Sequence, residues 1–233
     1  MIVFPLAAAL VSAAFGIHLL ARYGRRRGGN PAEGVWGVAM LMYAAASVAL
    51  ALGILDEWSS AEFRVYWLFG AVLNVPYLAA GEVYLLARNR WFGHGLLALV
   101  LALTAYATLE IRTAPASAPH LAQEFPLGRE VFGDGSVPHR LAQYYSYPAY
   151  LLLLAGTVWS ALKMRGRPDL VARFNGLLLL AVGATVVAVG SGVGAGLGNF
   201  ALFSAALAAG VIVMYWGFLT ATRGRHARAP SEA

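Results

Sequence analysis

The chain has 233 residues, of which 60% are hydrophobic and only 12% are charged, and its formal net charge is +6. This apolar share is above the roughly 45–50% typical of soluble domains, so a water-soluble surface is excluded for most of the chain. The absence of cysteine excludes disulfides, thiolate catalysis, iron–sulfur clusters and cysteine zinc sites.

The hydrophobic residues gather in seven stretches, each close to the ~20 residues that a helix needs to cross a bilayer. Backbone amides in hydrocarbon have no water partner, so a single stretch crosses only as a helix. The sequence therefore predicts an all-α fold, a seven-transmembrane-helix bundle that forms one domain over 1–222 with a short cytoplasmic tail at 223–233. The predicted spans are 2–21, 35–55, 65–87, 93–111, 142–162, 171–190 and 199–220, and an outer loop covers 112–141.

Basic residues fall mainly on one side of these spans. Of the 17 lysines and arginines, all but four lie on the side of the membrane where the first, third, fifth and seventh spans end. The positive-inside rule assigns that side to the cytoplasm and places the N-terminus outside and the C-terminus inside. We expect a multi-pass protein of the cell membrane, which in a prokaryote is the plasma (inner) membrane. The four exceptions are Arg64, Arg112, Arg129 and Arg140.

The same charges and a pattern of small residues bear on partners. Basic residues beside spans meet anionic headgroups first, and here they are dispersed over short loops, so we expect the lipid bilayer as a partner and no nucleic acid. Small-residue stripes in the sixth and seventh spans predict close helix packing, either within the chain or against a homo-oligomer or a membrane partner protein. The stripes are Gly176, Gly183 and Gly190, and Ala206, Gly210 and Gly217.

The ionisable residues Glu82 and His18 lie at least three residues inside predicted spans, where a charge facing lipid costs several kcal/mol. Both fall within about 9 Å of the cytoplasmic boundary at 1.5 Å per residue, and Asn175 falls in the same layer. One interpretation is a cluster in which Glu82 takes up and releases a proton, with His18 as its partner and Asn175 as an amide ligand. The other is structural: a protonated Glu82 bonded to a neighbouring helix or reaching a cytoplasmic arginine, and His18 facing the headgroups.

The middle of the third span carries Asn74, Pro76 and Tyr77. Proline has no backbone N–H, so it bends the helix and frees carbonyl groups. Freed groups are tolerated in a membrane where other helices, water or a ligand satisfy them, which predicts a polar cavity around the third helix. A bend satisfied by neighbouring helices alone is the alternative. Tyr43, Ser47 and Thr185 lie at comparable depth.

The long outer loop and the start of the fifth span form the outer surface. The loop is expected to be a cap or a mobile segment, with helix starts at Pro119 and Pro138. The tyrosines that follow favour the headgroup level as interface anchors, and the alternative is that they frame a ligand entrance together with the loop. They are Tyr144, Tyr145, Tyr147 and Tyr150.

No cofactor is expected. The topology is that of microbial rhodopsins, and 63–69 resembles the outer part of their third helix, but the only lysine, Lys163, lies at the cytoplasmic end of the fifth span. A retinal Schiff base needs a lysine in the seventh span, so retinal is excluded. His18 is the only histidine that lies more than two residues inside a predicted span, so the two ligands of a bis-histidine haem are not provided.

The leading hypothesis is a non-enzymatic transporter or sensor, which binds a small amphiphilic ligand or couples to protons in an intramembrane polar cavity. No catalytic residue and no metal site is predicted. A structural or accessory subunit of a membrane complex and a membrane enzyme acting on lipid stay open as alternatives. The candidate ligand-binding or proton-coupling residues are Glu82, His18, Asn74, Asn175, Tyr43 and Tyr77.

Overall fold

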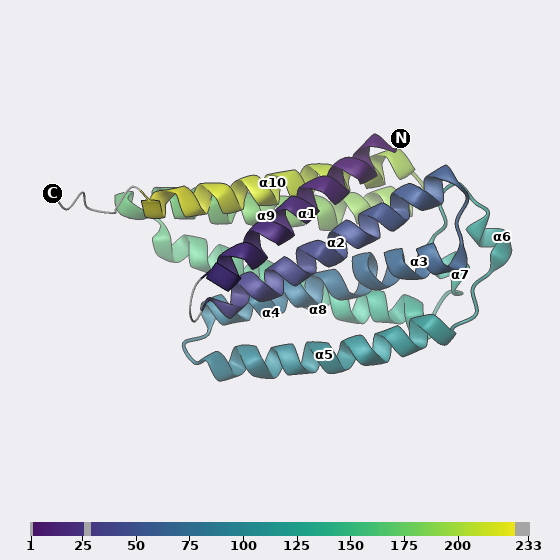
Figure 1. The fold of residues 1–233 in the computed structure, drawn as a ribbon, viewed down its shortest axis with the longest axis horizontal. Helices are drawn as coiled ribbons and strands as arrows, with labels where there is room; N and C mark the ends of the chain where they lie inside the picture. Colours follow the sequence, from purple (N-terminus) through teal and green to yellow (C-terminus); the bar gives the residue numbers. More distant parts are fainter. Residues whose placement is uncertain (1, 26–28, 227–233) are drawn as a thin grey trace.

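The computed structural model of the protein describes residues 2–25 and 29–226. Three of the arginines used in the topology argument, Arg26, Arg27 and Arg228, lie outside the described residues, as do residues 227–233 of the predicted tail. The described part is all-helical, and its long helices run side by side along one axis (Figure 1).

Seven long rods form the bundle, and the third of them is built from three consecutive segments. That rod is α3 (Ser60–Tyr66), the π-helical segment η1 (Trp67–Leu73) and α4 (Asn74–Leu86). The other long helices are α1 (Val3–Arg25), α2 (Pro31–Leu55), α5 (Arg90–Thr113), α8 (Val137–Met164), α9 (Val171–Gly196) and α10 (Phe200–His226), and the short helices are α6 (Ala118–Leu121), α7 (Gly128–Val131) and the 3₁₀ turn η2 (Pro168–Leu170).

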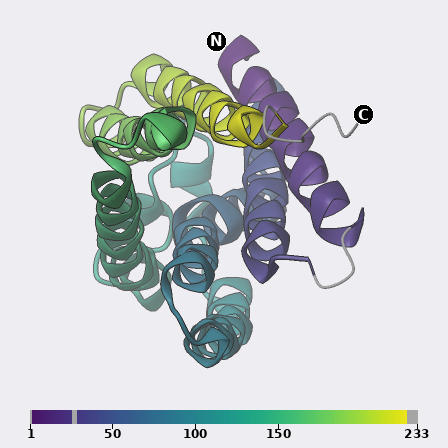
Figure 2. The same cartoon turned by 90° about the vertical axis from the view of Figure 1, so that its left-hand side faces the viewer.

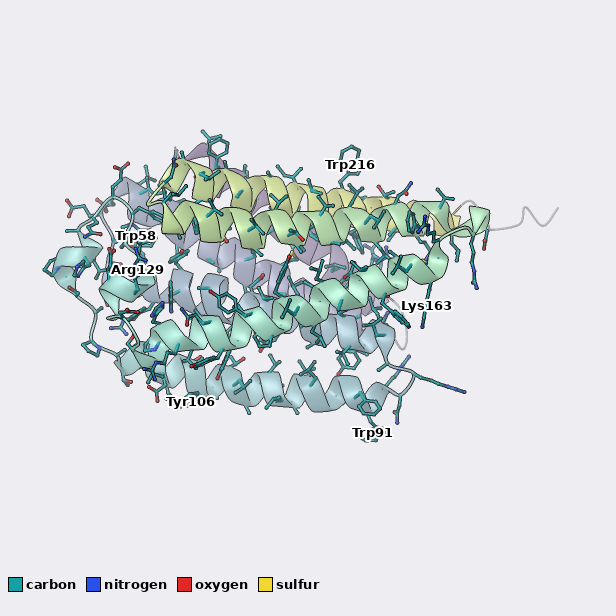
Figure 3. The ribbon with its side chains drawn as sticks, turned by 180° about the vertical axis from the view of Figure 1, so that it is seen from behind. Trp58, Trp91, Tyr106, Arg129, Lys163 and Trp216 are labelled. Carbon is teal, nitrogen blue, oxygen red and sulfur yellow. The ribbon has the colours of Figure 1, made fainter. Side chains whose placement is uncertain are left out.

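Six of the rods are long and apolar enough to cross a membrane: α1, α2, the α3–α4 rod, α5, α9 and α10. The prediction of an all-helical, multi-pass membrane protein is confirmed at this level. The remaining rod, α8, has 28 residues but is not among the six. Apolar side chains cover the outside of the bundle, for example Trp91 and Trp216, which point away from it in Figure 3.

Local sequence explains where several helices begin. Asn30 accepts a hydrogen bond from the backbone N–H of Ala32 at the start of α2, and Pro31 stands where no N–H is needed. Ser59 and Glu62 form a reciprocal capping box at the start of α3. Helices also begin at both predicted prolines, with Pro119 at the start of α6 and Pro138 at the start of α8.

Seen end-on, α2, α4, α8, α9 and α10 surround the centre of the bundle, as Figure 2 shows. Helix α1 packs on α2 and α10, and α5 packs on the outside of α4 and α8. The main neighbours of the third rod are α2, α5 and α8.

Helices α9 and α10 approach each other closely, as their small-residue stripes predict. A Cβ built on Gly183 would stand 2.6 Å from the carbonyl oxygen of Gly210, and one on Gly176 would stand 2.5 Å from that of Gly217. These glycines therefore pack two helices of the same chain against each other. The glycine-rich stretch 190–196 belongs to α9, which ends at Gly196, and the turn to α10 follows it, with Gly198 at φ 62°.

The two ends of the bundle differ. One end of the bundle holds the α1–α2, α4–α5 and α8–α9 connections and the end of α10 (Figure 1, left). We call it the arginine end, because the described basic loops lie there. We call the other end the cap end, because α6 and α7 fold over it (Figure 1, right). The predicted outer loop is therefore a packed cap, with Leu121, Val131 and Phe132 buried.

Candidate functional site

A cavity of about 530 Å³ lies between the helices that surround the bundle centre. Tyr66 and Trp67 line it toward the cap end, and Met40, Leu78 and Met214 line it deeper in the bundle. Its volume falls within the roughly 300–1,000 Å³ of pockets that hold small molecules. Polar lining residues come from α2, the third rod, α8 and α9 and are Tyr43, Ser47, Tyr66, Asn74, His139, Gln143, Ser146, Tyr147, Tyr150 and Ser191.

The π-helical segment beside the cavity is explained by Pro76. In the π register a carbonyl accepts from the fifth residue along the chain, so the carbonyl of Ala71 would need the N–H that Pro76 lacks. The hydroxyl of Ser146 on α8 donates to this carbonyl at 2.6 Å. The predicted freed carbonyl is thus satisfied by a neighbouring helix, and both Ala71 and Ser146 line the cavity.

Two predicted site residues, Tyr43 and Asn74, lie on the cavity and also join helices. The hydroxyl of Tyr43 donates to the carbonyl of Leu207 on α10 at 3.0 Å. The amide nitrogen of Asn74 donates to the carbonyl of Ala39 on α2 at 2.7 Å. The amide oxygen of Asn74 and the lone pairs of the Tyr43 oxygen remain as acceptors.

Two lining hydroxyls have no hydrogen bond to any described residue. Ser47 is 2% exposed, Tyr66 is half-buried, and both line the cavity. Their hydroxyls are therefore available to a molecule that occupies the cavity, water or a ligand. Both can donate and accept.

The cavity wall carries no formal charge. Among the described lining residues there is no Asp, Glu, Lys or Arg. The imidazole of His139 lines the cavity toward the cap end, where its Nδ1 is 3.3 Å from the exposed Asp134 carboxylate and its Nε2 is 3.3 Å from the amide nitrogen of Gln143.

A smaller void of about 20 Å³ lies deeper, toward the arginine end. It shares Met40, Leu78 and Leu153 with the main cavity and is also lined by Thr157 and Trp36. The indole N–H of Trp36 donates to the carbonyl of Leu78 at 2.8 Å. Apolar side chains thus narrow the space below the main cavity.

Glu82 lies one helical turn beyond Leu78 on α4 and is 1% exposed. Neither of its carboxyl oxygens has a hydrogen-bond partner among the described residues. Its side chain faces Gly156 of α8, where an added Cβ would stand 2.8 Å from its Cγ. Glu82 is not a lining residue of either void.

The three other predicted site residues lie elsewhere. The Nδ1 of His18 is 3.3 Å from the hydroxyl of Tyr215 on α10, and the hydroxyl of Tyr77 is 3.2 Å from that of Thr104 on α5. Asn175 is exposed on α9. The structure brings Tyr43 and Asn74 together on the cavity. It places Glu82 between the cavity and the arginine end, and it pairs His18 with Tyr215 instead of Glu82.

Sequence reasoning did not single out the polar face of α8. Gln143, Ser146 and Tyr150 are spaced three and four residues apart, so they share one face of a helix, and all three line the cavity. The tyrosines around them masked this spacing, because a tyrosine cluster at a span end is typical of interface anchors. The hydroxyl of Tyr150 donates to Thr185 on α9 at 3.0 Å.

The chain was compared with protein-family models, with curated proteins and with solved structures, and none of the three comparisons finds a match.

Proposed function

We propose that this protein binds a small, uncharged amphiphile in the central cavity, in the manner of a membrane transporter or sensor. The observation that carries the proposal is the 530 Å³ cavity with two unpartnered hydroxyls on its wall. A space of this size between helices, with a few polar groups on an apolar wall, is typical of ligand sites.

The wall favours an uncharged ligand. A charge moved from water or a headgroup region into an apolar site without a counter-ion is strongly unfavourable, and the described lining offers no carboxylate, ammonium or guanidinium group. Hydroxyl, carbonyl or amide groups on the ligand match the unpartnered hydroxyls of Ser47 and Tyr66 and the free amide oxygen of Asn74.

The distribution of polarity favours a ligand with two ends. The polar groups of Tyr43, Ser47 and Asn74 lie on α2 and the third rod, whereas the hydroxyls on the polar face of α8 already donate to protein partners. The α9 and α10 sides are mainly apolar, as Val187, Val211 and other lining residues illustrate. A ligand would therefore place its polar group toward α2 and its hydrocarbon part toward α9 and α10.

Photolabelling tests the proposal. The probe is a long-chain alcohol with a diazirine next to its hydroxyl end, added to the protein in lipid nanodiscs, irradiated and mapped by peptide mass spectrometry. We expect adducts on α2 and the third rod that excess unlabelled alcohol competes away, whereas adducts on the lipid-facing side of α5 persist because bulk lipid does not saturate. Cavity adducts that resist competition would overturn the proposal.

A matched pair of variants on α9 separates the cavity from the surface. Ala188→Phe places a ring in the cavity, because Ala188 lines it, and abolishes saturable labelling. Val182→Phe places the same ring on an exposed position that does not line the cavity, and leaves labelling unchanged. The carboxylate analogue of the probe is expected to label the cavity at least tenfold less.

The proposed topology has seven spans, with the arginine end in the cytoplasm of a cell whose plasma or inner membrane holds the protein. Support for α8 as a span comes from its 28 residues and from its polar residues, which lower its hydropathy but face the cavity, while Leu151, Trp159 and Leu162 are exposed outside. Single cysteines at Gly166 and Gly133 test it in this cysteine-free chain. An impermeant maleimide applied outside intact cells should modify only the cysteine at 133, and modification of both or of 166 alone would refute the topology.

A second candidate function, proton coupling at Glu82, is favoured by its burial without a partner. A carboxyl in that position is stable only when neutral or when a cation reaches it. A hydrophobic carbodiimide should modify Glu82, a water-soluble carbodiimide should not, and Glu82→Gln should remove the modification. Proton coupling also requires that photolabelling of the cavity depend on pH in the wild type but not in Glu82→Gln. If the two proteins have the same pH profile of labelling, proton coupling at Glu82 is rejected.

A further inference from the structure

We infer that the ligand enters and leaves the cavity sideways, from the cap-side leaflet of the membrane, through an opening between α8 and α9. The inference rests on the proposed binding function and adds its route and the source of the ligand. The cavity is closed by packed side chains toward both ends of the bundle, and one of its sides is lined by exposed residues.

The cap end of the cavity is closed by aromatic packing. Trp67 and Phe203 line the cavity, and the cap packs against their far sides. The Phe132 ring lies 6.1 Å from that of Trp67, and the Phe125 ring lies 5.0 Å from that of Phe203. A Cβ on Gly128 would stand 2.0 Å from the Trp67 ring, so the cap backbone itself rests on the indole.

Arg64 and Trp67 tie this closure to the rods. The guanidinium of Arg64 donates to the carbonyls of Ile111 and Ala114 at the end of α5, where the cap begins. The indole N–H of Trp67 donates to the carbonyl of Pro138 at 3.0 Å, where the cap ends and α8 begins. Water on the cap side therefore has a packed and hydrogen-bonded layer between it and the cavity.

The arginine end is closed by the core. Met40, Leu78 and Met214, all buried, line both the main cavity and the void of about 20 Å³ below it. Beyond them Glu82 and Gly156 are in contact. A void this small holds about one water molecule, so an amphiphile does not pass this way.

The side between α8 and α9 is different. Three lining residues there are exposed: Tyr147 on α8 is 66% exposed, Val189 on α9 is 55% exposed, and Gly192 on α9 is exposed as well. A Cβ on Gly192 would meet nothing within 4 Å. The cavity thus reaches the outer surface of the bundle along this seam.

The path of the two helices explains the opening. They meet near the arginine end and separate toward the cap end, as Figure 3 shows from the Lys163 end of α8 to its start. The hydrogen bond from Tyr150 to Thr185, 3.0 Å long, crosses the seam. Tyr147 and Val189 lie one turn closer to the cap end than Tyr150 and Thr185, so the opening begins just beyond this bond.

The position of the opening identifies the source of the ligand. It lies on the side of a helix bundle whose outer surface is apolar, and its rim carries the exposed tyrosine Tyr147 at the level where tyrosines anchor at headgroups. An uncharged amphiphile dissolved in the bilayer has its polar group at this level and its hydrocarbon part alongside the helices. It can therefore enter without crossing water.

Blocking the opening tests the route. Gly192→Trp places an indole at the rim, and Gly196→Trp, one turn further along α9, is the matched control, because a Cβ on Gly196 also meets nothing within 4 Å and Gly196 does not line the cavity. The readout is the rate at which the alcohol photoprobe, added to preformed nanodiscs, reaches its saturable cavity adducts. We expect Gly192→Trp to slow this rate at least tenfold and Gly196→Trp to leave it within twofold of wild type.

Two further measurements separate the route from the binding function. When the probe is present before nanodisc assembly, Gly192→Trp should still show the saturable adducts, because the cavity itself is unchanged. Gly192→Cys, modified by a bulky methanethiosulfonate and released by reductant, should slow entry reversibly and so replaces the tryptophan variant if that fails to fold. If the probe enters the blocked proteins at the wild-type rate, the proposed route is wrong and the proposed binding site is unaffected. If the wild type shows no saturable adducts, the route and the binding site are both wrong.

Discussion

Glu82 of α4 packs into the space that Gly156 of α8 leaves by having no side chain. A Cβ on Gly156 would stand 2.8 Å from the Cγ of Glu82, 3.0 Å from its Oε1 and 2.5 Å from a methyl carbon of Leu86. A carboxyl side chain and a glycine thus face each other across a buried interface. The missing side chain of Gly156 leaves space for Glu82 but provides no hydrogen-bond partner for its carboxyl group. Because the two residues are in contact, they determine how closely α4 and α8 approach.

The pairing predicts the cost of adding a methyl group. Gly156→Ala should lower the free energy of unfolding by about 1–3 kcal/mol, the usual cost of overpacking a core, measured by denaturant titration in detergent. Gly95→Ala on α5, where a Cβ meets nothing within 4 Å, is the control and should be neutral or slightly stabilising. In the Glu82→Ala background the cost of Gly156→Ala should shrink; additive effects would show that the two residues do not interact.

Ser146 provides a prediction about the π segment. Ser146→Ala removes the donor to the Ala71 carbonyl and leaves that carbonyl without a partner, which costs about 1–3 kcal/mol. Ser160→Ala on the same helix is the control, because Ser160 makes no hydrogen bond with a described residue. Hydrogen exchange at the amides of η1 should also speed up in Ser146→Ala alone, and equal stability of the two variants would contradict this account.

The features that the sequence predicts well are those decided along one helix. Apolar length and the positions of Pro119 and Pro138 predict the long rods and two helix starts, because a bilayer or a missing N–H constrains the chain locally. Pro76 also marks the irregular segment, since the missing donor is a property of that residue, and the carbonyl that it leaves free is satisfied by a neighbouring helix, as one of the two interpretations expects. The glycine stripes of α9 and α10 predict their contact for the same reason.

The features that the sequence did not predict depend on how the helices are rotated about their axes. Glu82, His18 and Asn175 lie at similar depth along the sequence, yet Glu82 faces α8, His18 faces α10 and Asn175 is exposed. Depth follows from the rise per residue, whereas rotation is set by packing against neighbours. The polar face of α8 was hidden because its Gln143 and Ser146 lie among tyrosines typical of an interface.

The bond between Tyr150 and Thr185 predicts a change in entry rate. Tyr150→Phe removes the only hydroxyl that donates across the α8–α9 seam among the described residues, at a cost of about 0.5–1.5 kcal/mol. The helices should separate more readily, so the alcohol photoprobe should reach the cavity several-fold faster than in wild type. Tyr144→Phe, on the exposed side of α8, is the control, and identical rates in both variants would contradict the role of the bond.

A change of charge at Ser47 predicts a change of ligand class. Ser47 is buried on the cavity wall with an unpartnered hydroxyl, so Ser47→Asp places a carboxylate where an uncharged head group is proposed to bind. A long-chain amine with the same diazirine should then gain saturable labelling, because its ammonium group supplies the counter-ion that a buried carboxylate needs, while labelling by the alcohol falls.

Ser47→Asn is the matched control for this change, because asparagine has nearly the shape of aspartate and no charge. It should keep the preference of the wild type for the alcohol over the amine, with at most a modest loss from its larger side chain. The comparison therefore isolates charge from volume at one position. If both variants shift toward the amine, or neither does, the head group of the ligand does not bind at Ser47, and the polar wall on α2 is not the part of the cavity that selects the ligand.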